Sequence, residues 1–75
     1  MTTEEEQAAL DAERAAFKRM RETHGPVTAA FAACARGNGT GPTIEQLRVL
    51  KAAIEAWEAA KARVNELVER VRQAG

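Results

Sequence analysis

Large apolar residues in the second half of the chain follow a heptad pattern. Over about residues 43–74 they recur alternately three and four positions apart. The repeating positions are Leu47, Leu50, Ile54, Trp57, Lys61, Val64, Val68 and Val71. This spacing places the side chains along one stripe of a helix and is typical of a coiled-coil seam. We therefore predict a helix over about residues 43–74 that packs through this stripe on another helix.

The first half of the chain repeats the pattern across a helix-breaking dipeptide. The apolar rows are Leu10, Phe17, His24 and Phe31, seven positions apart, and Met20, Val27 and Cys34 beside them. Gly25-Pro26 normally stops a helix, because proline lacks an amide hydrogen and its ring clashes with the preceding turn. The apolar register nevertheless passes through this point without a slip. We predict one helix over about residues 3–36 with a kink near residues 24–26, and a three-helix bundle as the alternative if the helix breaks there.

Capping residues and a glycine-rich turn delimit the two helices. Two capping boxes mark helix starts, Thr3 with Glu6 and Thr43 with Gln46. Residues 37–42 contain three glycines and a proline and cannot continue a helix, so they form the turn. No stretch alternates apolar and polar residues as a strand does. The predicted fold is all-α, a single domain over residues 1–75 that folds as an antiparallel helical hairpin.

A hairpin folded about this turn pairs residue i with roughly residue 79 − i. Phe17 then lies near Val64, and Phe31 lies near Leu47. On one flank of both stripes most residues are small, which permits close approach of the helices or a second packing surface. These small residues are Ala9, Ala16, Ala30, Ala53 and Ala60. Because two helices leave each stripe half exposed, we expect two hairpins to pack as a homodimeric four-helix bundle.

The composition favours this self-association. Seventeen of the 75 residues are alanine, which leaves few large side chains for a core. A core this thin is marginal for so short a chain without an oligomer or a partner. Eleven basic and eleven acidic side chains balance, which argues against tight binding to nucleic acid or anionic membranes through overall charge.

Several features of the sequence favour a cytoplasmic protein. One cysteine cannot form an internal disulfide, and the first residues are acidic where a secretory signal is basic and then apolar. No apolar run is long enough to cross a membrane, so no membrane association is expected. Arginine exceeds lysine eight to three beside abundant alanine, which is typical of a GC-rich bacterial or phage genome.

The sequence indicates neither catalysis nor metal binding. Cys34 and His24 are the only thiol and imidazole, and ten residues along one helix separate them by about 15 Å. One cysteine and one histidine also make no recognisable metal-ligand cluster. We therefore predict no enzyme activity, no metal and no cofactor.

Aromatic and polar residues in or beside the apolar stripes are the candidate binding residues. Trp57 and Phe31, extended by Val49, are expected to form a surface for a protein partner. Glu13 and Lys61 occupy stripe positions where an apolar residue would stabilise more. The expected pairing puts them about one turn out of register, so they meet only across a dimer or at a partner. We predict a non-enzymatic adaptor, chaperone or inhibitor that self-associates and binds a protein partner.

A nucleic-acid-binding regulator is the alternative function. Its candidate residues are Arg14, Lys18 and Arg21 on one helix face and Arg36 near the turn. A dimer would carry this basic stripe twice and could contact phosphates. The simpler interpretation is a solvated face whose charges pair with Asp11, Glu22 and Glu58. No aromatic residue is interleaved to stack on bases, so nucleic acid is not the favoured partner.

Overall fold

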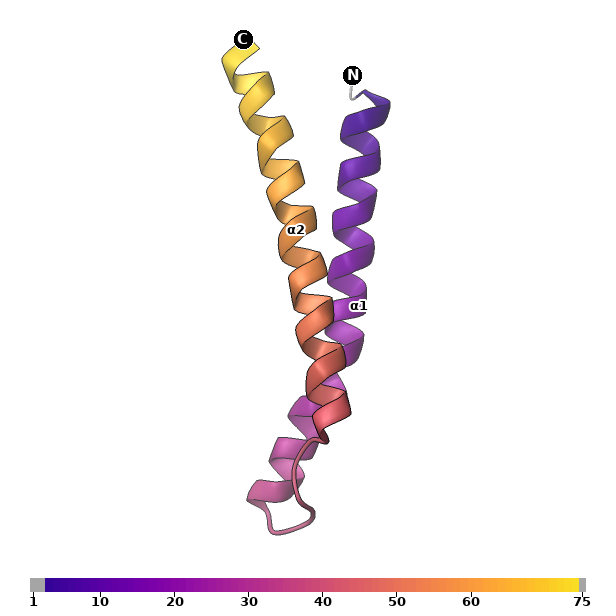
Figure 1. The fold of residues 1–75 in the computed structure, drawn as a ribbon, viewed down its shortest axis with the longest axis vertical. Helices are drawn as coiled ribbons and strands as arrows, with labels where there is room; N and C mark the ends of the chain where they lie inside the picture. The colour runs from indigo at the N-terminus through magenta and orange to yellow at the C-terminus, as the bar shows by residue number, and fades with distance from the viewer. Residues whose placement is uncertain (1–2, 75) are drawn as a thin grey trace.

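The chain forms two long antiparallel helices. The computed structural model describes residues 3–74, with α1 over Glu4–Ala35 and α2 over Ile44–Ala74, and those residues contain no strand. Figure 1 shows the helices joined by one loop, with both termini at the same end. The long dimension of the hairpin is 57 Å. The predicted all-α helical hairpin is confirmed.

Both helices begin with the expected capping boxes. At α1 the Glu6 amide donates to the Thr3 hydroxyl and the Thr3 amide donates to the Glu6 carboxylate, each over 3.2 Å. At α2 the Gln46 amide donates to the Thr43 hydroxyl over 3.0 Å, and the Gln46 side chain accepts from the Thr43 amide over 2.8 Å. These bonds satisfy amides that have no partner inside the helix, and they set where each helix starts.

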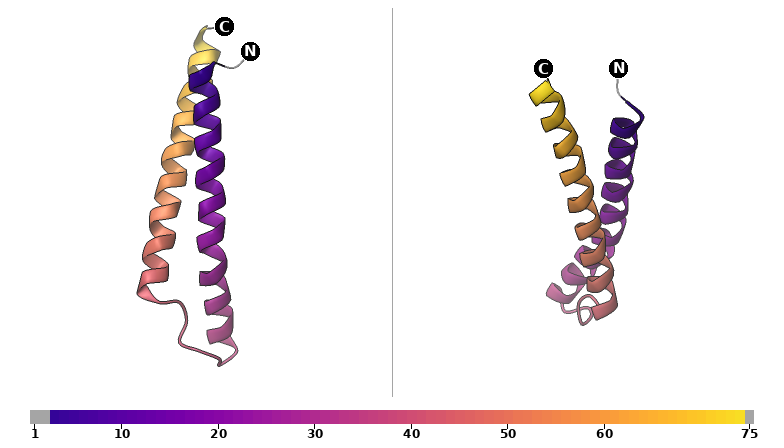
Figure 2. Two further views of the ribbon diagram at one scale, coloured as in Figure 1. Left: turned by 90° about the vertical axis from the view of Figure 1, so that its right-hand side faces the viewer. Right: turned by 45° about the horizontal axis from the view of Figure 1, so that its top comes forward.

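The first helix continues through Gly25-Pro26, so the three-helix alternative is wrong. Pro26 has no amide hydrogen to bond to the carbonyl of Glu22, and the helix loses one hydrogen bond there. Gly25 limits the remaining strain, because it has no Cβ to clash with the ring of the following proline. The side views show α1 as one unbroken ribbon (Figure 2).

A glycine ends α1 and sends the chain back along it. The Gly37 amide donates to the Cys34 carbonyl over 3.0 Å, and the Asn38 amide donates to the Ala33 carbonyl over 2.8 Å, which is a Schellman motif. Gly37 has a φ of 82°, a conformation that only glycine adopts without a steric penalty. Farther along the loop Gly41 lies beside Cys34. The second helix therefore begins well short of the tip of the hairpin (Figure 1).

This return of the chain shifts the pairing of the two helices. The Phe17 ring contacts Trp57, with ring centroids 5.2 Å apart, and not Val64, which lies seven residues farther along α2. The predicted pairing of residue i with roughly residue 79 − i is therefore wrong. That pairing assumes a tight turn. The loop between Ala35 and Ile44 instead runs back along α1 before α2 begins.

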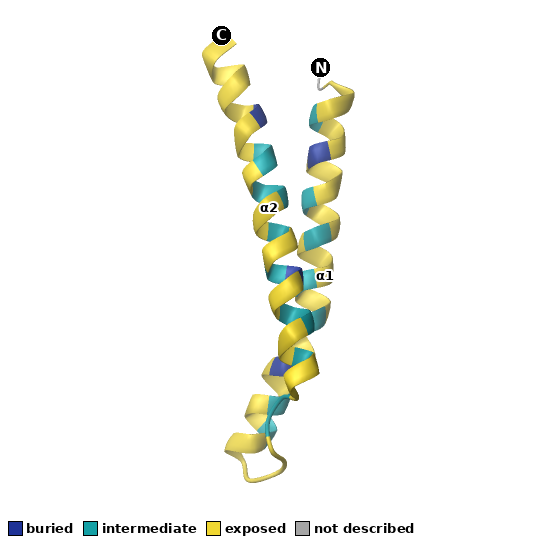
Figure 3. Ribbon diagram, viewed as in Figure 1, coloured by how far each residue is buried: buried dark blue, intermediate teal, exposed yellow. Residues whose placement is uncertain are grey.

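Two alanines and two larger apolar residues are buried between the helices. The buried residues are Ala9, Val27, Ala53 and Leu67. Figure 3 shows buried and half-buried positions along the facing sides of α1 and α2. We call the small flank identified in the sequence the alanine row; two of its members, Ala9 and Ala53, are buried in the contact, and alanine lets two helix axes come close.

Several large residues of the two predicted stripes lie at the edge of this contact, although Val27 is buried within it. Leu10, Phe17, Leu47, Val68 and Phe31 are 38, 37, 41, 50 and 57% exposed. The two stripes do meet within the hairpin, since Phe17 contacts Trp57 and Leu10 lines a groove with Val64 and Val68, but the five residues are only partly covered. The alanine row brings the axes together next to them and turns them partly toward solvent.

Candidate interaction surface

Large apolar side chains from both helices share one face of the hairpin. On α1 they follow one row at seven-residue spacing, and on α2 they follow two adjacent rows. The contact of Phe17 with Trp57 joins these rows across the helix pair, and Leu10 lines a groove with Val64 and Val68. We call this surface the apolar face. Its residues are Leu10, Phe17, Phe31, Leu47, Leu50, Ile54, Trp57, Val64, Val68 and Val71.

The apolar face exposes a large hydrophobic area for so small a chain. Six of its residues are 37–58% exposed, and these are Leu10, Phe17, Phe31, Leu47, Val68 and Val71. With about 150–250 Å² for a large side chain, these six together expose about 500 Å². The largest apolar patch on a typical monomer covers about 300–600 Å² and is often functional. The area alone therefore marks this face as a candidate binding surface.

An apolar groove lies at the open end of the hairpin, where the helices diverge toward the termini (Figure 1). We call it the open-end groove, and its volume is about 210 Å³. The lining residues are Glu6, Ala9, Leu10, Val64, Leu67, Val68 and Val71. Glu6 is the one charged residue among them, so the groove offers mainly hydrocarbon to an occupant.

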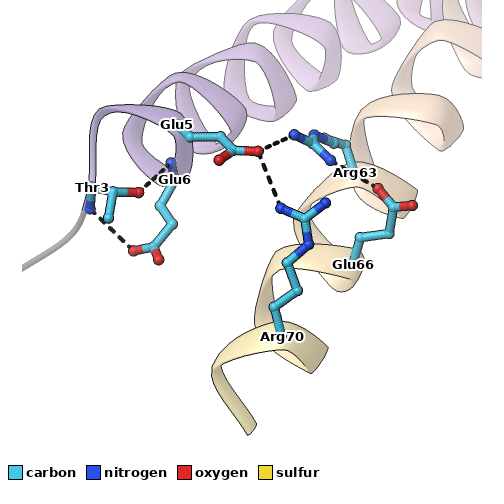
Figure 4. Close-up of polar contacts among 6 residues, drawn as sticks. All are labelled: Thr3, Glu5, Glu6, Arg63, Glu66 and Arg70. Atoms are coloured by element: carbon cyan, nitrogen blue, oxygen red, sulfur yellow. Dashed lines mark hydrogen bonds and ion pairs between the residues drawn. The ribbon is translucent and has the colours of Figure 1, made fainter. Parts of the chain in front are cut away.

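Ion pairs tie the two helices together at this end. Glu5 of α1 pairs with Arg63 and, over 3.3 Å, with Arg70 of α2, while Arg63 also pairs with Glu66 over 3.0 Å (Figure 4). The hydrogen bond to Glu66, with nearby Glu5, raises the pKa of the Arg63 guanidinium above its usual value. These side chains are well exposed, so salt screens the pairs. Sequence reasoning missed them because they follow from the shifted pairing.

Trp57 brings two polar candidates together within one hairpin. Its Nε1 donates to Glu13 Oε1 over 3.1 Å, and Lys61 Nζ lies 3.9 Å from the centroid of its ring system. Within residues 3–74 Glu13 and Lys61 form no ion pair with each other, so the expectation that they meet only across a dimer or at a partner stays a prediction. An indole offers a hydrogen-bond donor at its edge and a negative face to a cation, so both half-buried groups have a local partner.

The three residues expected to form a protein-binding surface do not form one patch. Trp57 and Phe31 both belong to the apolar face, but Phe31 lies near the loop end and Trp57 lies near the middle of the hairpin. Val49 lies on the opposite flank, where it lines a shallow hollow with Ala16 and Arg19. Only the apolar face is continuous along both helices.

The basic stripe, formed by Arg14, Lys18 and Arg21, borders the apolar face. These residues line one hollow around Phe17, and Arg21 Cζ lies 5.8 Å from the centroid of the Phe17 ring. Within residues 3–74 none of the three cations forms an ion pair. The partners that the sequence suggests are Asp11, Glu22 and Glu58. Over the described residues those ion pairs are not formed, but Glu22 lines the same hollow as the three cations and partly offsets their charge.

The remaining polar candidates are scattered. Arg36 is the C-cap of α1 and lies about 20 Å along the helix from Arg21, so it is not part of the basic stripe. Cys34 is exposed, and the His24 Nδ1 lies 3.3 Å from the Thr28 hydroxyl. Across residues 3–74 no three His, Cys, Asp or Glu side chains gather to hold a metal ion.

Comparison of the chain with protein-family models, with curated proteins and with solved structures gives no match. Neither helix, over the residues described, has an apolar stretch of the length that a bilayer requires. The apolar face and the charges around it are therefore the features of this chain that indicate a function.

Proposed function

We propose that this protein is a non-enzymatic interaction protein that pairs with helices through its apolar face. The observation that carries the proposal is the exposure of six large apolar residues along one face of the hairpin. At about 25 cal/mol per Å², covering about 500 Å² would contribute roughly 12 kcal/mol before the costs of association. A surface of this kind favours a bound state over an isolated hairpin.

Helices are the partners that suit this surface. Its rows run lengthwise along both α1 and α2, and side-chain rows of another helix pack into the grooves between such rows. We infer that one partner is the chain itself, so that two hairpins form a four-helix bundle. The dimer then acts in the cytoplasm as an adaptor, chaperone or inhibitor of another protein. The single exposed thiol of Cys34 is consistent with a reducing compartment.

Sedimentation equilibrium of the full chain over a range of concentrations tests this proposal, with helicity followed by circular dichroism. We expect a helical dimer. The Leu47→Ser/Val68→Ser double variant removes two apolar groups that are already 41 and 50% exposed, so it should stay helical but dissociate. Ile44→Ser is the matched control, because Ile44 is 77% exposed but lies off the apolar face. A wild-type chain that is helical and monomeric at every concentration contradicts the proposal.

The basic stripe supports a second candidate function, the binding of nucleic acid phosphates, because its three cations form no ion pair within residues 3–74. A mobility-shift series with mixed RNA and duplex DNA at low salt tests it, because phosphate contacts weaken steeply as salt rises. The Arg14→Gln/Lys18→Gln/Arg21→Gln variant should lose any retention. Arg48→Gln/Arg72→Gln removes two cations that are already paired with glutamates, and it should retain nucleic acid. Absence of retention by the wild type removes this candidate.

A further inference from the structure

We propose that the apolar face binds a second copy of the chain whose loop lies at the opposite end, so that Phe31 of each copy enters the open-end groove of the other. This inference rests on the proposed self-association and specifies its geometry. Two hairpins that pack face to face about a two-fold axis can place their loops at the same end or at opposite ends. Only the second arrangement brings Phe31 to the groove.

The contacts between the helices show which residues of α1 and α2 lie at the same position along the hairpin axis. Glu13 and Phe17 both contact Trp57. A residue of α1 is therefore level with the residue of α2 for which the two numbers sum to about 72. On this scale Ala74 marks the terminal end, Arg36 marks the loop end, and the midpoint lies near the level of Phe17.

The protruding side chain and the groove lie at matching distances from this midpoint. Phe31 is fourteen residues toward the loop, which is about 21 Å along the axis. The two ends of the open-end groove, Leu10 and Val71, lie about 10 and 24 Å from the midpoint on the terminal side. A two-fold axis perpendicular to the helices at the midpoint therefore carries Phe31 of one copy over the groove of the other.

Phe31 and the open-end groove also match in size and in apolar character. Phe31 is 57% exposed at a level beyond the start of α2, so the hairpin itself leaves the ring largely uncovered. The groove has a volume of about 210 Å³ and a mainly apolar lining, which suits an aromatic ring. Packing the ring there would cover the most exposed aromatic residue and fill the groove at the same time.

The arrangement with both loops at one end leaves these features unmatched. Each Phe31 would then be level with the loop end of the other copy, and the two open-end grooves would face each other. Facing grooves would bring the exposed Leu10, Val68 and Val71 of one copy against the same residues of the other, and both Phe31 rings would stay outside a groove. Packing therefore favours loops at opposite ends.

Charges along the edges of the contact provide a second test. With loops at opposite ends, α2 lies along α2 of the second copy, and Lys51 comes level with Glu58 of the second copy, which is favourable. On the α1 side, Arg14 comes level with Arg21 of the second copy, which is unfavourable. With loops at the same end, Arg14 would instead come level with Glu58 of the second copy.

The native Cys34 allows the arrangement to be measured directly. A spin label on this exposed thiol, seventeen residues from the midpoint, should give an intermolecular distance of about 50 Å by electron double resonance. Loops at the same end would give less than about 25 Å, because neighbouring helix axes lie about 8–10 Å apart. Thr40→Cys in a Cys34→Ser background repeats the measurement at the loop, in case a label on Cys34 disturbs packing. A short distance at both sites overturns the proposed arrangement but leaves self-association intact.

Two substitutions then test the contacts themselves. Phe31→Ala should raise the dimer dissociation constant at least about thirtyfold, as loss of one buried aromatic anchor does, while Ile44→Ala should leave it nearly unchanged. Arg14→Glu should tighten the dimer, because the new carboxylate faces Arg21 of the second copy. Equal effects of Phe31→Ala and Ile44→Ala, or a weaker dimer with Arg14→Glu, contradict the arrangement. A monomeric wild type overturns both this inference and the proposed function.

Discussion

Enlarging Ala53 tests whether the alanine row is the true contact between the helices. Ala53 is 4% exposed and faces α1, while the larger Leu47 and Val68 of α2 lie partly in solvent. Ala53→Leu adds three carbon atoms at a point where the two backbones come close. The heptad pattern alone suggests that the large stripes form the contact. Ala53 would then lie on the flank of that contact, and Ala53→Leu would be tolerated.

The expected loss follows from the burial of Ala53, which is 4% exposed although it also borders the hollow beside Ala16 and Val49. Overpacking a closely packed contact costs about 1–3 kcal/mol, because side chains leave their preferred rotamers or the helices move apart. For a chain of this size each 1 kcal/mol shifts the melting temperature by about 4–8 °C. We therefore expect Ala53→Leu to lower the melting temperature by about 8–16 °C, which corresponds to about 2 kcal/mol.

Thermal unfolding followed by circular dichroism measures this loss. Ala59→Leu is the matched control, because Ala59 is an exposed alanine of the same helix and its replacement should change stability by less than about 0.5 kcal/mol. All proteins are compared at one chain concentration, since self-association raises the apparent stability. Equal melting temperatures for Ala53→Leu and Ala59→Leu would refute the alanine contact.

Three further substitutions probe the backbone and the Trp57 cluster. Gly37→Ala should lower the free energy of unfolding in urea by about 1 kcal/mol, because the φ of 82° is strained for alanine; an unchanged urea midpoint would contradict the Schellman cap. Pro26→Ala should raise stability by about 1–3 kcal/mol, since it restores a helix hydrogen bond, and hydrogen exchange should show the new amide protected. Glu13→Ala should cost about 1 kcal/mol and shift the emission of Trp57, the only tryptophan, because the indole N–H loses its acceptor; unchanged emission would argue against that bond.

The sequence by itself determined the local structure of this protein. The capping boxes at Thr3 and Thr43 predicted where the helices begin, because a side chain three residues away can satisfy the free amides. The glycines of the loop predicted where α1 ends, since Gly37 must adopt a positive φ. The heptad register that passes through Pro26 favoured one continuous helix, and the helix is continuous. All of these features depend on residues within one or two turns of each other.

Only the tertiary structure decided how the two helices meet. The alanine row and the rows of large apolar residues share the same heptad period, so periodicity cannot tell which of them forms the closest contact. Alanine permits a close approach of the two backbones, and Ala53 is buried in the contact. The path of the loop sets the pairing of the helices. Because a few loop residues run back along α1, each residue of α1 faces a residue of α2 that lies more than one turn away from the partner expected for a tight turn. That shift places Glu13 on Trp57, and it leaves Phe31 beyond the start of α2. The apolar face therefore follows from packing between distant segments, which a local pattern does not specify.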